Sequence, residues 1–375
     1  MLYAGPFVND PIELPPQRRH RRGFQRAGLA PHHERWFNRS LAAMVALFGF
    51  GWIYTIAYAS ETDRDALLST TIIENPLRPD ASPPAAFLVD AAVRAFADAA
   101  YRGESGAVNV VVQPPGDTLL LPDSLPPGTA IEYAPAGGDT TQSAPSSGSG
   151  VWNVLLRMRT GVRTVPDLAV IRLVPLSEKR EGRIGSYRIG SWPNERGGAR
   201  SPQYEPPAGL VRVTPENQDL RVSRHFRLRD FLTKGQQDVW PKYVAMSPRL
   251  LDKLELTIDE LNASGTPVEH VGVISGFRTP EYNAAGGSTA GRGALSRHMY
   301  GDAMDWYVDN DRDGRMDDLN GDGRIDAADG RVIVEAAERV EKKYPHLVGG
   351  IGLYRPTGAH SGFVHLDTRG FRARW

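Results

Sequence analysis

Apolar and polar positions follow different periods along the chain, and these periods predict its elements. Residues 41–59 are apolar and carry no charged side chain. Residues 151–156 and 168–173 are short strand-like runs rich in branched apolar residues. Residues 247–261 repeat leucine and isoleucine at helical spacing, which predicts an amphipathic helix. Residues 271–275 form a further short apolar run and predict a strand.

The longest apolar run is about as long as one bilayer crossing, which takes about 20 residues. An Arg-rich segment precedes it and acidic residues follow it, which fits the positive-inside pattern. We therefore expect residues 40–60 to be a single-pass signal anchor in the inner (cytoplasmic) membrane, with the C-terminal part periplasmic. A cleaved signal is the alternative, because Ala57-Tyr58-Ala59 resembles a cleavage site. A buried core helix fits less well, since the run has no polar face.

Composition and pattern together divide the chain into segments and predict an α+β protein. Helical spacing recurs at 330–344, and residues 184–193 read as a turn-rich β segment. The predicted segments are a disordered basic cytoplasmic tail (1–39), the transmembrane anchor (40–60), a membrane-proximal mixed segment (61–133), a flexible linker (134–150), a β-rich accessory module (151–218) and a C-terminal domain (219–375).

Charge and cysteine content narrow the chemistry. The chain has 44 basic and 44 acidic residues, so no global charge favours nucleic acid as a partner. It has no cysteine, which excludes disulfides, thiolate metal sites and cysteine nucleophiles. A bound metal must therefore use His, Asp, Glu or backbone oxygen atoms.

Two histidines and an aspartate in the C-terminal region lie among glycines and short apolar runs. They are His298, Asp305 and His365. Imidazole and carboxylate groups hold Zn²⁺ in catalytic sites, where three protein ligands leave the fourth position open for water. We therefore expect these three residues to be zinc ligands. Spacing alone is not specific, because a His and an Asp seven positions apart are common.

The residues around these ligands resemble a known family. The pattern Ser-x-His-x-x-Gly-x-Ala-x-Asp, followed by a distal His on a short strand, is similar to the zinc D-Ala-D-Ala carboxypeptidases and dipeptidases. That family belongs to a wider group that contains lysostaphin and the hedgehog signalling domain. The matching positions are Ser296, His298, Gly301, Ala303 and Asp305. The resemblance covers residues 220–375 and implies a small, mostly antiparallel sheet flanked by helices.

An upstream segment, 275–283, reads Ser-Gly-Phe-Arg-x-Pro-x-x-Asn and resembles the arginine segment of the same family. By this resemblance Arg278 would bind the substrate carboxylate or stabilise the developing oxyanion. The arginine would then belong to the same site as the three proposed zinc ligands.

The chain departs from the family at the general base. The dipeptidases have a Glu three residues before the last ligand, where this chain has Gly362. The carboxypeptidases have a His two residues before it, where this chain has Phe363. His360 is the nearest candidate and has a counterpart in some murein endopeptidases of the group. Asp367 and Asp302 are weaker candidates, and Asp367 is better suited to orienting a ligand histidine.

An acidic insertion, residues 309–329, separates Asp305 from the last ligand. Oxygen ligands at positions 1, 3 and 5 with Gly at position 6 wrap one hard cation, and this spacing occurs twice. The second loop resembles a dockerin loop because it has Asp at position 12. The spacing predicts structural Ca²⁺, with a solvated acidic loop as the alternative. The candidate calcium ligands are Asp309, Asp311, Asp313, Asp318, Asn320, Asp322, Asp326 and Asp329.

The resemblance implies hydrolysis of peptide bonds in peptidoglycan stem peptides or cross-links, which contain D-amino acids. The segment Phe-Val-His-Leu-Asp-Thr-Arg-Gly without Glu is most similar to the periplasmic murein endopeptidase branch, which favours an endopeptidase over a carboxypeptidase. The expected partners are peptidoglycan peptides and the membrane. Two alternatives are a weakly active or inactive zinc-fold module that binds the cell wall or a protein, and a calcium-dependent interaction protein that uses 309–329.

Overall fold

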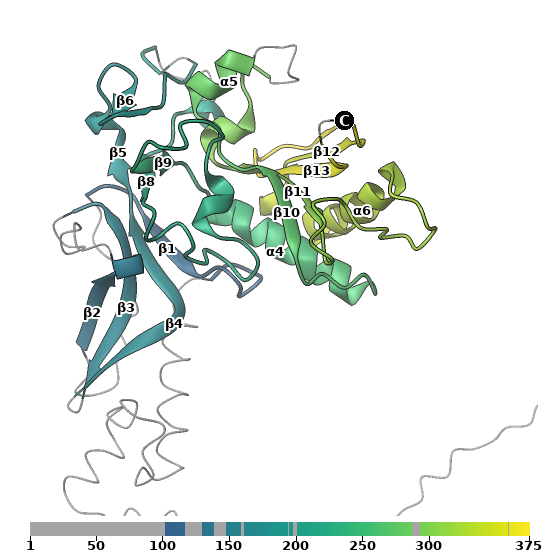
Figure 1. Ribbon diagram of the computed structural model, residues 1–375, viewed down its shortest axis with the longest axis horizontal. Coiled ribbons are helices and arrows are strands. Elements are labelled where there is room, and N and C mark those ends of the chain that lie inside the picture. Colours follow the sequence, from purple (N-terminus) through teal and green to yellow (C-terminus); the bar gives the residue numbers. More distant parts are fainter. Residues whose placement is uncertain are drawn as a thin grey trace, which may run out of the picture. The chain divides into compact units, whose positions relative to one another are not determined.

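The computed structural model (Figure 1) describes residues 102–116, 130–138, 148–158, 161–193, 195–197, 201–286, 293–358 and 360–375. The predicted tail, anchor and cleavage site lie outside these residues. Within them, no helix has both the length and the apolar character that a membrane crossing requires. All of them belong to one of the two units into which the chain divides, Thr62–Trp375.

A five-stranded sheet in the order β10-β11-β13-β12-β14 carries the C-terminal region. The strands are β10 (Val271–Ser275), β11 (Ala303–Val308), β12 (Gly350–Tyr354), β13 (Phe363–Asp367) and β14 (Ala373–Arg374). Neighbouring strands are antiparallel except for β12 and β14, which are parallel. The strand predicted at 271–275 is confirmed.

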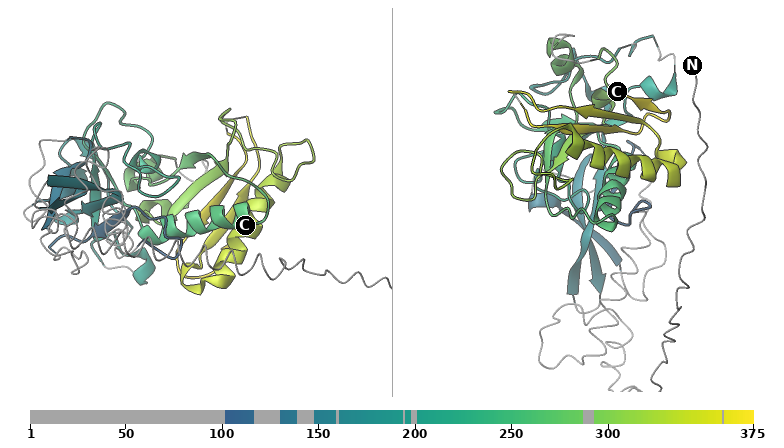
Figure 2. Two further views of the ribbon diagram at one scale, coloured as in Figure 1. Left: turned by 90° about the horizontal axis from the view of Figure 1, so that it is seen from below. Right: turned by 90° about the vertical axis from the view of Figure 1, so that its right-hand side faces the viewer.

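Two long helices lie together on one face of this sheet (Figure 2). They are α4 (Pro248–Ala263) and α6 (Ala327–Lys343), and a short helix, α5 (Pro280–Gly286), follows β10. Helix α6 packs against β12 and β13, and α4 packs against α6. The helices predicted at 247–261 and 330–344 are therefore confirmed, with α6 beginning slightly earlier than predicted.

Alternate residues of the two central strands face opposite sides of the sheet. Met304 and Trp306 of β11 and Val364 of β13 are buried in the main apolar core. Successive side chains of a strand point to opposite faces. Asp305 and His365 therefore point away from the helix-covered face, and this alternation separates the core from the candidate site.

A second sheet has the order β1-β4-β3-β2. Its strands are β1 (Val110–Gln113), β2 (Ala130–Pro135), β3 (Gly150–Met158) and β4 (Gly161–Arg172), with β1 parallel to β4 and the other pairs antiparallel. Because β2 pairs with β3, residues 136–149 connect two strands of one sheet, and the ends of the predicted linker 134–150 belong to these strands. The predicted membrane-proximal segment, linker and accessory module all contribute to this sheet.

Short strands join the predicted accessory module to the C-terminal region. They are β5 (Val174–Pro175), β6 (Arg183–Ile184), β7 (Tyr187–Arg188), β8 (Gly209–Val213) and β9 (Lys242–Val244). Strand β8 pairs with β5 and β9, and one apolar core contains residues from both sides of position 218. The core therefore has no break at the predicted boundary between 218 and 219.

Short 3-10 helices complete the fold. They are η2 (Ala136–Gly138), η3 (Leu176–Glu178), η4 (Pro202–Tyr204), η5 (Leu228–Phe231), η7 (Arg297–Tyr300) and η8 (Pro345–Leu347). The mixture of helices with largely antiparallel sheets confirms the predicted α+β class.

Candidate functional site

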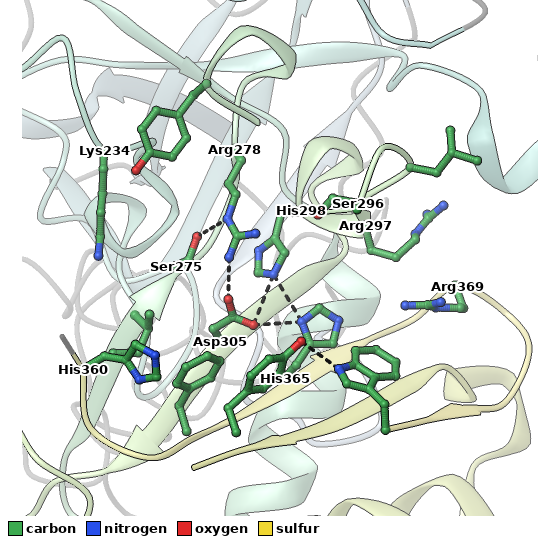
Figure 3. A pocket seen from close by; sticks show the side chains of 17 residues that line it. Lys234, Ser275, Arg278, Ser296, Arg297, His298, Asp305, His360, His365 and Arg369 are labelled. Carbon is green, nitrogen blue, oxygen red and sulfur yellow. Dashed lines mark hydrogen bonds and ion pairs between the residues drawn. The ribbon is translucent and has the colours of Figure 1, made fainter. Parts of the chain in front are cut away.

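Three side chains from separate elements meet at one point in an open pocket (Figure 3). Asp305 lies on β11 and His365 on β13, and these two residues are direct cross-strand partners. Ser275 of β10 is the partner of Asp305 on its other side. Opposed residues of antiparallel strands have Cβ atoms about 4.5–5.5 Å apart, so the strand register alone brings Asp305 and His365 together.

The third side chain, His298, is held in place by the segment that follows β10. Its Nδ1–H donates a hydrogen bond of 2.6 Å to the carbonyl oxygen of Gly276, and the backbone N–H of Arg278 donates to the carbonyl oxygen of His298 at 3.1 Å. Gly301 ends the 3-10 helix at a φ of 74°, and a Cβ there would lie 2.4 Å from the carbonyl carbon of Ala245. Only glycine fits this turn without strain.

The three side chains turn unprotonated atoms toward one another. His298 Nε2 lies 3.2 Å from Asp305 Oδ1 and 3.2 Å from His365 Nδ1, and His365 Nδ1 lies 2.8 Å from Asp305 Oδ1. Since His298 Nδ1 and His365 Nε2 donate to oxygen acceptors elsewhere, the neutral rings direct lone pairs to the centre. In this tautomer the three acceptor atoms repel one another unless a cation, either a metal ion or a proton on His365 Nδ1, lies between them.

The spacing of these atoms agrees with a metal site. A tetrahedral zinc ion with bonds of about 2.0–2.1 Å would separate two ligand atoms by about 3.3 Å. All three side chains are buried, with His298 2%, Asp305 3% and His365 5% exposed. This group could therefore hold a metal ion.

The electrostatics of the group favour an ionised aspartate beside neutral His298. Burial raises the pKa of Asp305, but the adjacent His298 and His365 outweigh burial and bring it below its usual range. Burial lowers the pKa of His298. Burial also disfavours the charged form of His365, but its hydrogen bonds to Asp305 and Asp367 outweigh that effect and raise its pKa.

Asp367 lies behind His365 and outside the pocket lining. Its Oδ2 accepts a hydrogen bond of 3.0 Å from His365 Nε2. Its Oδ1 accepts from the backbone N–H groups of Gly350 at 2.7 Å and Arg369 at 3.1 Å. The Asp367 side chain is 0% exposed. This geometry suits the orienting role weighed from the sequence, since metal-binding histidines commonly donate their second N–H to a carboxylate.

A buried ion pair between helices α4 and α6 supports the end of strand β13, where Asp367 lies. Lys253 of α4 donates hydrogen bonds of 2.6 Å to Glu341 of α6 and 2.7 Å to the carbonyl oxygen of Asp367. Glu341 also accepts from the backbone N–H of Gly349 at 2.9 Å. Lys253 is 0% exposed. Sequence reasoning missed this pair, because a lone lysine on an amphipathic helix is typical of its solvent-facing side.

The pocket has a volume of about 660 Å³ and two chemically different walls. One wall is polar and cationic and includes Lys234 and Arg278. The other wall is aromatic and includes Tyr354 and Trp375. Among the described residues that line the pocket, Asp305 is the only one with a carboxylate side chain.

The aromatic wall is a row of ring contacts that reaches the candidate metal-binding group. His360 lies edge-on to Phe363 with ring centroids 5.0 Å apart, and Phe363 stacks on Tyr354 at 4.5 Å. The indole N–H of Trp375 donates to the Tyr354 hydroxyl at 2.7 Å, and the Trp375 ring lies 5.1 Å from that of His365. Trp375 remains 50% exposed. No sequence pattern indicates its place beside His365, which depends on the pairing of β14 with β12.

The two remaining predicted catalytic residues also line the pocket. Arg278 donates hydrogen bonds of 2.6 Å to Asp305 Oδ2 and 2.8 Å to Ser275 Oγ, so it fixes the carboxylate whose other oxygen faces the histidines. His360 donates from Nδ1 to the carbonyl oxygen of Ser361 at 2.7 Å. Since a carbonyl only accepts, the neutral His360 ring carries its lone pair on Nε2.

The first loop of the acidic insertion gathers three carboxylates. Ligand atoms of Asp309, Asp311 and Asp317 lie within 4.8 Å of one another. Asp313, also predicted as a ligand, lies outside this group and accepts a hydrogen bond of 2.7 Å from the backbone N–H of Arg315. The sequence interpretation missed Asp317, although it occupies position 9 of the loop that begins at Asp309.

In the second loop the carboxylates bind the backbone of their own loop. Asp318 accepts from three backbone N–H groups, and the buried Asp329 accepts from three more. Asn320 and Asp322 each accept one such bond. Asp326 caps the start of α6 by accepting from the backbone N–H of Ala328. The predicted loop fold is thus present, while the bound ion stays a prediction.

Comparison of the chain with protein-family models, with curated proteins and with solved structures finds no match. Any statement about its family or its reaction therefore rests on the sequence motifs and on the geometry of the site.

Proposed function

We propose that this protein is a zinc-dependent peptidase that hydrolyses peptide bonds in peptidoglycan stem peptides or cross-links. The observation that carries the proposal is the convergence of His298 Nε2, Asp305 Oδ1 and His365 Nδ1 at an open pocket. The motifs that resemble the zinc D-Ala-D-Ala peptidases surround these same residues, and they favour endopeptidase over carboxypeptidase action.

The three convergent residues would hold the metal, and the rest of the chain would keep them in place. Zinc, when bound, acts as a Lewis acid and makes water a stronger acid near neutral pH. Gly276 and Asp367 fix the ring orientations of the two histidines by accepting their outer N–H groups. This arrangement keeps the inner nitrogen of each ring unprotonated and directed at the metal position.

Arg278 has two tasks in this proposal. Its guanidinium holds Asp305 through the 2.6 Å contact, which leaves Oδ1 directed at the histidines. It also lines the pocket, where its positive charge would stabilise negative charge that develops on the substrate carbonyl oxygen. Such charge stabilisation is effective when the donor is already in position before the reaction.

His360 is the proposed general base. It lines the pocket and carries its lone pair on Nε2, since Nδ1 donates to Ser361. An imidazole can take a proton from water and deliver it to the leaving amine near neutral pH. No other histidine of the described pocket lining is available, because His298 and His365 would be metal ligands.

A second candidate function is a non-catalytic module that binds the cell wall or a protein partner. One observation favours it: in the described pocket lining, Asp305 is the only residue with a carboxylate side chain. A metal-binding pocket without an effective base would bind peptides without cleaving them.

Digestion of purified peptidoglycan tests the proposal. The protein would be incubated with the substrate in the presence of zinc or of a zinc chelator, and the products would be separated by mass. Zinc-dependent conversion of cross-linked dimers to monomers indicates an endopeptidase, and release of D-alanine indicates a carboxypeptidase. No product from protein that contains bound zinc would refute the peptidase.

Replacement of His360 separates the enzyme from the binding module. In an enzyme that uses His360 as base, His360→Ala lowers turnover by about 100- to 10,000-fold while zinc content is retained. In a binding module the same change leaves peptide affinity unchanged, and turnover is absent before and after it. His346→Ala is a matched control, because His346 is exposed and lies outside the pocket.

We also propose that calcium binds the 309–329 insertion as a structural clip. The gathered carboxylates of Asp309, Asp311 and Asp317 support the proposal. Carboxylate oxygens are the ligands that calcium prefers. A docking role would make calcium necessary for binding a partner, whereas a clip would make it necessary only for stability.

The proposed location is the inner membrane, with residues 40–60 as anchor and the C-terminal domain outside the cytoplasm. The uncharged run and the Arg-rich segment before it support this placement. Extraction with alkaline carbonate and sequencing of the mature N-terminus would test it. An anchored protein stays with the membrane and keeps its N-terminus, whereas a cleaved one begins near residue 60.

A further inference from the structure

The pocket has more positive than negative charge among its described lining residues. Three arginines line it, and each pairs with a carboxylate: Arg278 with Asp305, Arg297 with Asp302, and Arg369 with Asp367. In each pair the negative charge of the carboxylate cancels the positive charge of the arginine. A metal ion would add its own positive charge to the site.

Lys234 differs from these arginines. It lines the same pocket, is exposed, and has no hydrogen-bond or ion-pair partner within the described part of the chain. Figure 3 shows its amino group pointing into the pocket on the side where Arg278 lies. Lys234 is therefore a positive charge in the pocket that no side chain in the described part of the chain neutralises.

The backbone next to Lys234 is fixed to the arginine segment. The Thr233 hydroxyl donates a hydrogen bond of 3.1 Å to the carbonyl oxygen of Phe277 and accepts one of 3.0 Å from the backbone N–H of Thr279. These two contacts flank Arg278 on both sides. Thr233 is buried, so the attachment is shielded from water. The position of the lysine is thus coupled to the part of the chain that holds the metal-binding aspartate.

We infer that Lys234 is a specificity-determining residue that binds a carboxylate of the substrate, at a position away from the bond that is cleaved. The inference rests on the proposed peptidase function and names a feature of its substrate. Peptides supply negative charge only as carboxylates, either at the C-terminus or on an acidic side chain. An unpaired ammonium group in the pocket selects such an anionic peptide over its neutral amide.

Equilibrium binding of a matched peptide series tests the inference. The probe is a synthetic tetrapeptide that contains one glutamate and ends in D-Ala-D-Ala. It is compared with a version amidated at the C-terminus and a version with glutamine in place of glutamate. Calorimetry with zinc-loaded protein at low temperature measures affinity, and separation of the recovered peptides by mass verifies that they stayed intact, so the result does not depend on turnover.

We expect one of the two neutral replacements to weaken binding to the wild-type protein about fivefold, and to have no effect on Lys234→Ala. The replacement that matters identifies the carboxylate. Lys234→Arg keeps the preference because the charge is retained. The preference decreases as salt is added, since exposed charges are screened. Lys342→Ala, which removes an exposed lysine of α6 outside the pocket, behaves as wild type.

Two results would overturn the inference. One is equal affinity of the wild-type protein for all three peptides, and the other is a preference that survives in Lys234→Ala. If hydrolysis of peptidoglycan is intact in either case, the proposed function stands and only the role of Lys234 fails. Binding of none of the three peptides overturns both the inference and a peptide substrate of this kind.

Discussion

Two regions of this chain concentrate metal-binding residue types, and they are built in opposite ways. The group at His298, Asp305 and His365 is buried, and it turns two ring nitrogens and a carboxylate oxygen toward one another. In the 309–329 insertion, four of the eight carboxylates are exposed, and carboxylates such as Asp318 and Asp329 already accept hydrogen bonds from backbone N–H groups.

The two regions would therefore differ in how much stability they lose without a bound cation. Buried acceptors that face one another repel, and little solvent reaches them to compensate. Carboxylates that accept backbone N–H groups keep those partners when the ion leaves. We therefore expect the buried group to depend strongly on its metal and the acidic loop to depend weakly on calcium.

Replacement of a buried ligand should have the largest effect. His298→Ala removes one of the three convergent atoms and opens space in the group, so we expect the protein to lose bound zinc and all measurable peptidoglycan hydrolysis. Metal content by mass spectrometry and product formation check this. His346→Ala is the control and should leave both unchanged. Retention of stoichiometric zinc in His298→Ala would exclude this residue as a ligand.

The ion pair behind the site should make the next largest contribution. Lys253→Met keeps the length of the side chain but leaves Glu341 without its 2.6 Å partner in the interior. Breaking a buried pair in this way costs about 3–5 kcal/mol. Denaturant unfolding measures the loss, and Lys342→Met is the exposed control. A loss below about 1 kcal/mol would show that Glu341 is satisfied by Arg374 and Gly349 alone.

The carboxylate that orients His365 should affect metal binding more than folding. Asp367→Asn keeps the size of the side chain but offers an amide where His365 and Arg369 need a carboxylate. Loss of such an orienting partner lowers metal affinity about 10- to 100-fold. Competition with a zinc chelator measures the affinity, and thermal unfolding of the metal-free protein measures any separate loss of stability. A change in stability without a change in affinity would make Asp367 a structural residue only.

The contrast between the two regions also explains what could be predicted from the sequence. Helix α4 and strand β10 follow from local periodicity, because the residues that define them are adjacent in the chain. The grouping of His298, Asp305 and His365 was inferred from a motif, and the structure brings them together through strand register. Local patterns and motifs therefore predicted the centre of the site well.

Residues that reach the site through distant pairing could not be predicted in this way. Trp375 lies beside His365 only because β14 pairs with β12, and two-residue strands have no periodicity to detect. Lys253 is buried because Glu341, on another helix, lies opposite it. Lys234 has no local pattern at all. The walls and supports of the pocket thus depend on the tertiary fold, whereas its centre depends on a motif.

The smallest expected effect is that of calcium on the acidic loop. Weak calcium sites of extracellular modules have dissociation constants of about 0.1–1 mM. At 1 mM calcium, such a site would stabilise the protein by about 0.4–1.4 kcal/mol, since only the folded state binds. Thermal unfolding with and without calcium measures this shift.

Two variants locate the calcium site. Asp311→Asn keeps a side-chain oxygen for its 3.1 Å bond from the Asp313 N–H but removes the charge. It should abolish the shift if calcium binds the first loop, and Asp322→Asn should abolish it if calcium binds the second. Zinc content and turnover should be the same in both variants as in the wild type, because neither carboxylate lines the pocket. A loss of turnover on calcium removal would instead connect the insertion to the pocket. The structure offers one route, because the backbone N–H of Met316 donates to the Ser361 hydroxyl beside His360 at 2.7 Å.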